Sequence, residues 1–140
     1  MAFIDREIEV VADIRDVYGL WVAFEDYPKF MAEVERVDLV QEDATHWVAV
    51  VEDEVVEWDA DIVQHEPETV IKWEAVDGRE TGEVKFEKRG DDRTAVQYKL
   101  EFDAGAWDRD ENEVLEWMEG RVENGLEAFK ELVEAVEAEG

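Results

Sequence analysis

Residues 110–137, DENEVLEWMEGRVENGLEAFKELVEAVE, decide the fold of this 140-residue chain. Apolar residues recur there at alternating spacings of three and four, the period of one face of an α-helix. The pattern predicts one long C-terminal helix, which must bury this face against another element. The face consists of Leu115, Met118, Val122, Gly125, Phe129, Leu132 and Val136.

The segments before this helix predict the surface that covers it. Between residues 34 and 103, apolar and polar residues alternate in successive runs separated by turns such as Glu66-Pro67-Glu68 and Asp77-Gly78. A period of two is typical of strands with one buried face, and short turns make neighbouring strands antiparallel. We expect a curved sheet whose concave face holds the helix, with Gly125 allowing helix and sheet to approach closely. The predicted inward residues are Trp47, Ala49, Val51, Val56, Trp58, Ala60, Ile62, Ile71, Trp73, Ala75, Val84, Phe86, Val96, Tyr98, Leu100 and Phe102.

The N-terminal segment predicts a further strand and two short helices. Ile4, Ile8 and Val10 alternate with charged residues, as in a half-buried strand. Asp13 then precedes apolar residues at helical spacing, and Pro28 separates this helix from a second short one. The chain is therefore expected to be a single α+β domain over residues 1–140, with about seven strands and two short helices between the first two strands.

The charge of the chain limits its partners. The formal net charge is -27, from 41 acidic and 14 basic residues. Such a charge repels nucleic acid and anionic lipid, so DNA, RNA and membranes are excluded as expected partners. No basic region followed by a long apolar run opens the chain, so we predict neither a signal peptide nor a membrane span, and expect a cytoplasmic protein.

An acidic coat of this size on a chain rich in Trp and Phe resembles the surfaces of proteins from salt-loving organisms. If the chain is salt-adapted, its melting temperature should rise between low and molar KCl, because counterions screen the repulsion between carboxylates. Thermal melts at increasing KCl test this, and a midpoint that does not rise contradicts it.

Few residues are available for catalysis or metal binding. The chain has no cysteine and no serine, and its two histidines lack metal-ligand spacing, so we expect no metal and no cofactor. His46 and His65 have no base or nucleophile near them in sequence, and we interpret them as surface residues. Asp59 and Asp61 alternate on one strand and could form a paired-carboxylate site, but chance pairs are abundant among 41 acidic residues, and we interpret them as part of a solvated charged face.

Several runs resemble one family. Residues 10–31, residues 55–61 and residues 125–132 are similar to the first helix, one strand and the last helix of the START-like (SRPBCC) superfamily, which includes the polyketide cyclase/dehydrase proteins. The resemblance implies a helix-grip fold around an internal cavity for a small apolar ligand. In the aromatase/cyclase members an arginine and a tyrosine handle the substrate, and the corresponding positions here are Ile62 and Val34, so both polar groups are missing.

The resemblance also implies which residues line a cavity, although ordinary core packing explains aromatic residues at inward positions equally well. Tyr98 is the weak candidate for a catalytic group. Arg121 and Asn124 flank the apolar face of the last helix, where a side chain could reach the cavity mouth. Arg121 has no acid three or four residues away, so it otherwise pairs with another element or lies along Trp117 with its head in solvent. Trp107 is either a lid or a cap on the core. The expected cavity is aromatic and nearly uncharged, lined by Trp21, Phe30, Trp58, Ile62, Trp73, Phe86, Tyr98 and Met118.

Three functions remain open at this point. The first is binding of a lipid-, quinone- or polyketide-like molecule in the internal cavity. The second is a polyketide cyclase/dehydrase-type enzyme that uses Tyr98 or an ordered water. The third is a protein-interaction module of the same superfamily.

Overall fold

The computed structural model describes residues 2–51, 53–107 and 109–139. Its elements confirm the predicted order of a strand, two short helices, a strand meander and a long helix. They are β1 (Ala2–Val10), α1 (Ile14–Val22), the 3-10 helix η1 (Phe24–Lys29), β2 (Val34–Gln41), β3 (Ala44–Val51), β4 (Glu54–Glu66), β5 (Val70–Ala75), β6 (Glu80–Gly90), β7 (Arg93–Phe102), the 3-10 helix η2 (Ala104–Trp107) and α2 (Glu111–Glu139).

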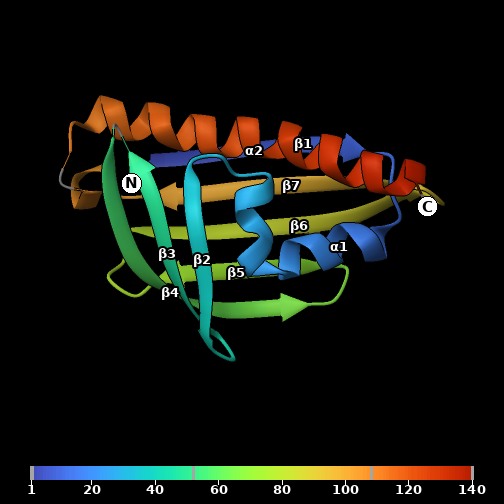
Figure 1. Cartoon of the computed structure of the whole chain (residues 1–140), viewed down its shortest axis with the longest axis horizontal. Helices are drawn as coiled ribbons and strands as arrows, with labels where there is room; N and C mark the ends of the chain where they lie inside the picture. The colour runs from blue at the N-terminus through green and yellow to red at the C-terminus, as the bar shows by residue number, and fades with distance from the viewer. Residues whose placement is uncertain (1, 52, 108, 140) are drawn as a thin grey trace.

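The seven strands form one antiparallel sheet in the order β1-β7-β6-β5-β4-β3-β2. Figure 1 shows β2, β3 and β4 running steeply across the direction of β5, β6 and β7, so the sheet is strongly bent. The turns use positive backbone φ angles at Asp53, Glu68 and Gly78, where the predicted turn residues lie. The helix α2 runs alongside β1 and also contacts β7 and η2, and the long helix held by the bent sheet is the helix-grip arrangement (Figure 1).

The buried face of α2 differs from the predicted face at both ends. Met118, Val122 and Phe129 are buried as expected, but Val114 replaces Leu115, which is 37% exposed. Val136 is 50% exposed, whereas Val133 is fully buried. Both differences fall near the ends of α2, where the elements that cover the helix decide burial and the three-four pattern does not specify them. The helix buries Val114, Met118, Arg121, Val122, Leu126, Phe129 and Val133.

The predicted role of Gly125 is also corrected. A side chain at this position would first meet Met31 Cγ at 3.6 Å and the Phe30 carbonyl oxygen at 3.8 Å, both ordinary contact distances. Gly125 therefore faces the segment after η1, which covers this part of the helix, and not the sheet.

The two short helices close one side of the sheet. Asp13 caps α1 by accepting a hydrogen bond from the Arg15 backbone N–H at 2.8 Å. Helix η1 contains Pro28, and its Tyr27 hydroxyl donates to the Trp21 carbonyl at 2.6 Å. This bond ties η1 to the end of α1 and fixes the position of Phe24, the first residue of η1.

Candidate ligand-binding site

The residues predicted to line a cavity lie mostly in the interior of the bent sheet. Ile62 is half-buried, and the others are at most 7% exposed. The ring of Phe86 packs edge-on against Tyr18 of α1 at 5.5 Å. The structure brings together Trp21, Phe30, Trp58, Trp73, Phe86, Tyr98 and Met118 in one core cluster, against which Ile62 packs.

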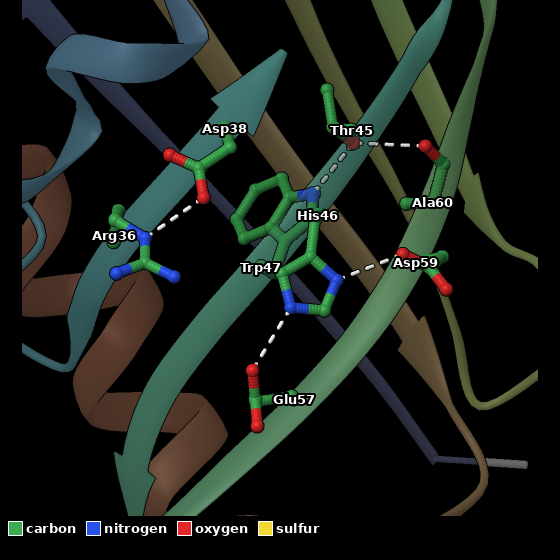
Figure 2. Close-up of polar contacts among 8 residues, drawn as sticks. All are labelled: Arg36, Asp38, Thr45, His46, Trp47, Glu57, Asp59 and Ala60. Carbon is green, nitrogen blue, oxygen red and sulfur yellow. Dashed lines mark hydrogen bonds and ion pairs between the residues drawn. The ribbon is translucent and has the colours of Figure 1, made fainter. Parts of the chain in front are cut away.

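Aromatic rings pack against one another through this interior. Trp47 lies between two indoles, stacked at 5.7 Å on Trp58 and at 5.6 Å on Trp73. Its own indole N–H donates to Thr45 Oγ1, which in turn donates to the Ala60 carbonyl (Figure 2). At the other end of the cluster, Trp21 packs on Tyr98 at 5.6 Å. These interlocked rings fix the shape of the interior.

A buried ion pair crosses the interior between α2 and β6. Arg121 donates to both carboxylate oxygens of Glu80, at 2.6 Å and 2.9 Å, and both side chains are 0% exposed. The Trp73 indole N–H donates to the same carboxylate at 3.2 Å. The expectation of a nearly uncharged interior is therefore wrong. Of the two alternatives for Arg121, a partner on another element is confirmed.

Aromatic faces surround the guanidinium of Arg121. Its central carbon lies 5.3 Å from the Trp47 ring, 5.8 Å from the Trp58 ring and 5.6 Å from the Trp117 ring. Cation–π attraction therefore adds to the pairing with Glu80. We call Glu80, Tyr98 and Arg121 the interior polar cluster, because charges on Glu80 and Arg121 also act on the Tyr98 hydroxyl.

The protonation states in this cluster follow from burial and from the ion pair. Burial alone would lower the pKa of Arg121, but the Glu80 carboxylate outweighs burial and raises it above its ordinary value. Burial raises the pKa of Tyr98 to about 12, with a smaller lowering by Arg121. Arg121 is thus always charged, and Tyr98 carries its proton throughout the physiological pH range.

A groove of 340 Å³ opens beside this interior, between the α1–η1 segment and strands β2 and β4. Its apolar walls are Val22, Phe24, Leu39 and Ile62. Phe24 is 4% exposed, and its ring packs edge-on against Trp73 at 6.2 Å. Phe24 therefore separates the groove from the aromatic interior. The rim carries Glu25, Asp26, Glu42, Asp43 and His65.

A larger depression of 520 Å³ lies elsewhere, against strands β5 to β7. Charged and amide side chains such as Glu7, Lys85 and Gln97 form much of its lining. It has no connection to the aromatic cluster other than Phe86. The smaller groove beside Phe24 is the better match to an apolar ligand.

The structure decides between the two roles considered for Trp107. Its side chain is 4% exposed and packs edge-on against Trp58 at 4.9 Å. The guanidinium of Arg79 lies 4.8 Å from its ring. Trp107 therefore caps the core at the end of the sheet where α2 begins.

The two histidines have carboxylate partners that lie far from them in sequence. Figure 2 shows the His46 ring between two residues of the neighbouring strand β4. Its Nδ1 lies 2.8 Å from Asp59 Oδ1 and its Nε2 lies 3.0 Å from Glu57 Oε1. Both contacts require a donating nitrogen, so this geometry fits the imidazolium. The hydrogen bonds that His46 donates, first to Glu57 and then to Asp59, raise its pKa. His65 lies 3.5 Å from Asp43 at the groove rim.

The His46 contacts predict a pH-dependent contribution to stability. Because the pKa of folded His46 lies above the ordinary 6.5, its stabilisation is complete below the unfolded pKa and disappears as pH rises through the folded pKa. Urea unfolding should show H46Q less stable than the native chain at about pH 5.5, with the gap closing by about pH 9. When Glu57 and Asp59 are also replaced (E57Q/D59N), the effect of H46Q on stability should depend less on pH. If the difference in stability between H46Q and the native chain is constant with pH, the charge of His46 does not stabilise the fold.

Asp59 thus belongs to a histidine contact, and Asp61 lies directly opposite Ala44 on β3. Among the described residues, no group of three or more His, Asp or Glu side chains could hold a metal ion. Over the same residues, no helix is both long and apolar enough to cross a membrane.

Comparison with known proteins identifies the family. The family model described as "Polyketide cyclase / dehydrase and lipid transport" matches residues 1–134. A Streptomyces lincolnensis relative, an uncharacterized 17.2 kDa protein in the melC2-rnhH intergenic region, is 30% identical over 136 residues, which cover 96% of this chain and 91% of the relative.

Solved structures share the fold at low sequence identity. TTHA0849 from Thermus thermophilus has a TM-score of 0.80 at 23% identity, covering 96% of this chain and 99% of its own. A START superfamily protein from Mycobacterium smegmatis has the same TM-score at 14% identity, with coverages of 96% and 98%. The aromatase/cyclase ZhuI from a Streptomyces species has a TM-score of 0.73 at 19% identity, with coverages of 96% and 92%. The chain therefore belongs to the polyketide cyclase/dehydrase and lipid transport family and has the helix-grip fold of the START-like superfamily.

Proposed function

We propose that this chain binds a small apolar molecule in the groove between α1–η1 and strands β2 and β4, without a covalent step. The observation that carries the proposal is the apolar wall of the groove, in which Phe24 is shared with the aromatic interior. A ligand that enters there can exchange contacts with water for contacts with Val22, Leu39 and Ile62. The family description, which includes lipid transport, supports this proposal.

The chemistry of the interior favours binding over a cyclase reaction. A tyrosine that acts as a base must lose its proton near neutral pH, whereas burial raises the pKa of Tyr98 to about 12. An arginine that stabilises an enolate must offer unpaired positive charge, whereas Arg121 is paired with Glu80 through two hydrogen bonds.

A charge placed in the groove should abolish binding. Leu39 is 49% exposed and lines the groove, whereas Val76 is 67% exposed and lies outside it. We expect L39E to bind the neutral naphthyl ketone dye prodan at least about tenfold more weakly than the native chain, because the ligand would lose apolar contacts and desolvate a carboxylate.

The matched variant V76E adds the same charge to the surface and should bind prodan like the native chain. Fluorescence titration measures both affinities, and native mass spectrometry with organic extraction identifies any molecule that the purified protein carries. Equal binding by L39E and V76E would place the ligand elsewhere. A native chain that binds no prodan and carries no molecule would contradict the proposed function.

A further inference from the structure

Three buried donors, two in the interior polar cluster and one on Trp58, lack hydrogen-bond acceptors. Within the described part of the chain, Tyr98 Oη, Arg121 Nε and Trp58 Nε1 are buried and have no hydrogen-bond partner. Each of these groups can donate a hydrogen bond, and a buried donor without an acceptor costs free energy. A hydrogen bond with Arg121 lowers the pKa of Tyr98, so Arg121 can donate to Tyr98 Oη while the Tyr98 proton stays free for another acceptor. The group that would complement them is an acceptor oxygen.

The charge balance of the cluster limits what that oxygen can carry. Arg121 and Glu80 cancel each other, Tyr98 keeps its proton, and the Glu33 carboxylate adds negative charge that also acts on Tyr98, so the cluster offers donors without net positive charge. A carboxylate brought into this interior would be a buried charge with no counterion of its own. A neutral carbonyl oxygen accepts the same hydrogen bonds without this cost.

The groove leads toward the cluster through two aromatic side chains. Phe24 forms the inner wall, its ring packs against Trp73, and the Trp73 indole N–H donates to Glu80. A ligand that displaces the Phe24 ring would keep its apolar body in the groove and bring one polar end to the Trp73 ring, whose centroid lies 6.0 Å from that of Tyr98. The acidic groups on the rim, Glu25, Asp26, Glu42 and Asp43, repel anions at the entrance.

We propose that the interior polar cluster recognises a neutral acceptor oxygen on the ligand, and that the chain discriminates against apolar carboxylates such as fatty acids. This inference rests on the proposed function, because the groove holds the apolar part of the same ligand. Tyr98 and Arg121 are the donors, and Glu80 sets the selectivity for neutral molecules by cancelling the charge of Arg121.

Three naphthalene derivatives of similar size test the inference by calorimetry. They are 2-acetylnaphthalene, which has a neutral ketone, 2-naphthoate, which has a carboxylate, and 2-ethylnaphthalene, which has no oxygen. The ketone should bind about tenfold more tightly than the hydrocarbon, as expected for one net hydrogen bond. It should also bind at least about tenfold more tightly than naphthoate, and this preference should persist in about 1 M KCl, where repulsion by the rim is screened.

Two variants assign the ketone preference to the cluster. Tyr98 has an unpartnered hydroxyl, so Y98F should fold like the native chain, bind 2-ethylnaphthalene unchanged and lose most of the preference for the ketone. The matched control Y18F removes a hydroxyl from α1, outside the cluster, and should keep the preference. Circular dichroism confirms that both variants are folded.

The possible failures are distinguishable. If the native chain binds the ketone and the hydrocarbon equally, or if Y98F keeps the full preference, the cluster does not recognise the oxygen and the inference is overturned while the proposed function stands. If 2-naphthoate binds as tightly as the ketone in molar KCl, the proposed discrimination against carboxylates is wrong. If none of the three compounds binds, both the proposed function and this inference are overturned.

Discussion

Replacing Glu80 with glutamine is expected to lower the free energy of unfolding by about 3–5 kcal/mol, because it leaves the fully buried guanidinium of Arg121 without a counterion. Glutamine keeps the size of the side chain and an oxygen that can accept from the Trp73 indole. The loss therefore reports the charge and not a cavity or a missing acceptor. Urea unfolding of E80Q and of the native chain at neutral pH measures it.

Two further variants test this explanation. The double variant E80Q/R121M removes both charges and should recover most of the lost stability, because no buried ion then lacks a partner. On the same strand, Glu83 forms a more exposed pair with Lys85 at 3.5 Å, and E83Q should change stability by less than about 1 kcal/mol. If E80Q and E83Q cost the same, the interior pair is not the buried charge that the structure shows.

The alternation of apolar and polar residues predicted most of the fold, because each strand has one buried face. The inward residues of β5 and β7, such as Trp73 and Tyr98, are buried as predicted, and the short turns correctly predicted antiparallel neighbours. The residues buried at the ends of α2 were harder to predict. Whether Val114 or Leu115 is buried depends on how the helix is rotated against its neighbours. Two adjacent apolar residues satisfy the sequence pattern equally well.

The same alternation contained a signal for the ion pair that the sequence prediction missed. Val84 and Phe86 were assigned inward, and two steps of two residues toward the N-terminus lead through Gly82 to Glu80. Glu80 was not recognised because the chain has 41 acidic residues and exposure is the usual state of each. Its burial depends on Arg121, which lies 41 positions away on a helix whose rotation the sequence leaves open.

Strand register explains why the partners of His46 were also missed. The turn between β3 and β4 pairs Trp47 with Trp58 and therefore His46 with Asp59. The residue opposite a histidine can be inferred only after that register is fixed, and a shift of one residue would change the face of every side chain. Distance along the sequence was the wrong criterion for finding a carboxylate partner in an antiparallel sheet.

Gly82 is the position at which the smallest substitution should have a large effect on stability. A Cβ atom there would lie 2.2 Å from Cε2 and Cζ2 of the Trp73 ring, closer than any real contact. The indole cannot easily move away, because it stacks on Trp47 at 5.6 Å and donates to Glu80. We expect G82A to lose about 3 kcal/mol or more of unfolding free energy and to change the near-ultraviolet circular dichroism of the tryptophans.

The matched control is G19A, because a Cβ at Gly19 of α1 meets nothing within 4 Å. Alanine is the better helix former, so this variant should be as stable as the native chain or more stable by up to about 1 kcal/mol. Thermal and urea unfolding of both variants give the comparison. If G82A unfolds like the native chain, the Trp73 ring is free to shift, and the ordered contact from Phe24 through Trp73 to Glu80 would not be rigid. A large loss in G82A alone instead indicates that the Trp73 ring is held in place between Phe24 and Glu80.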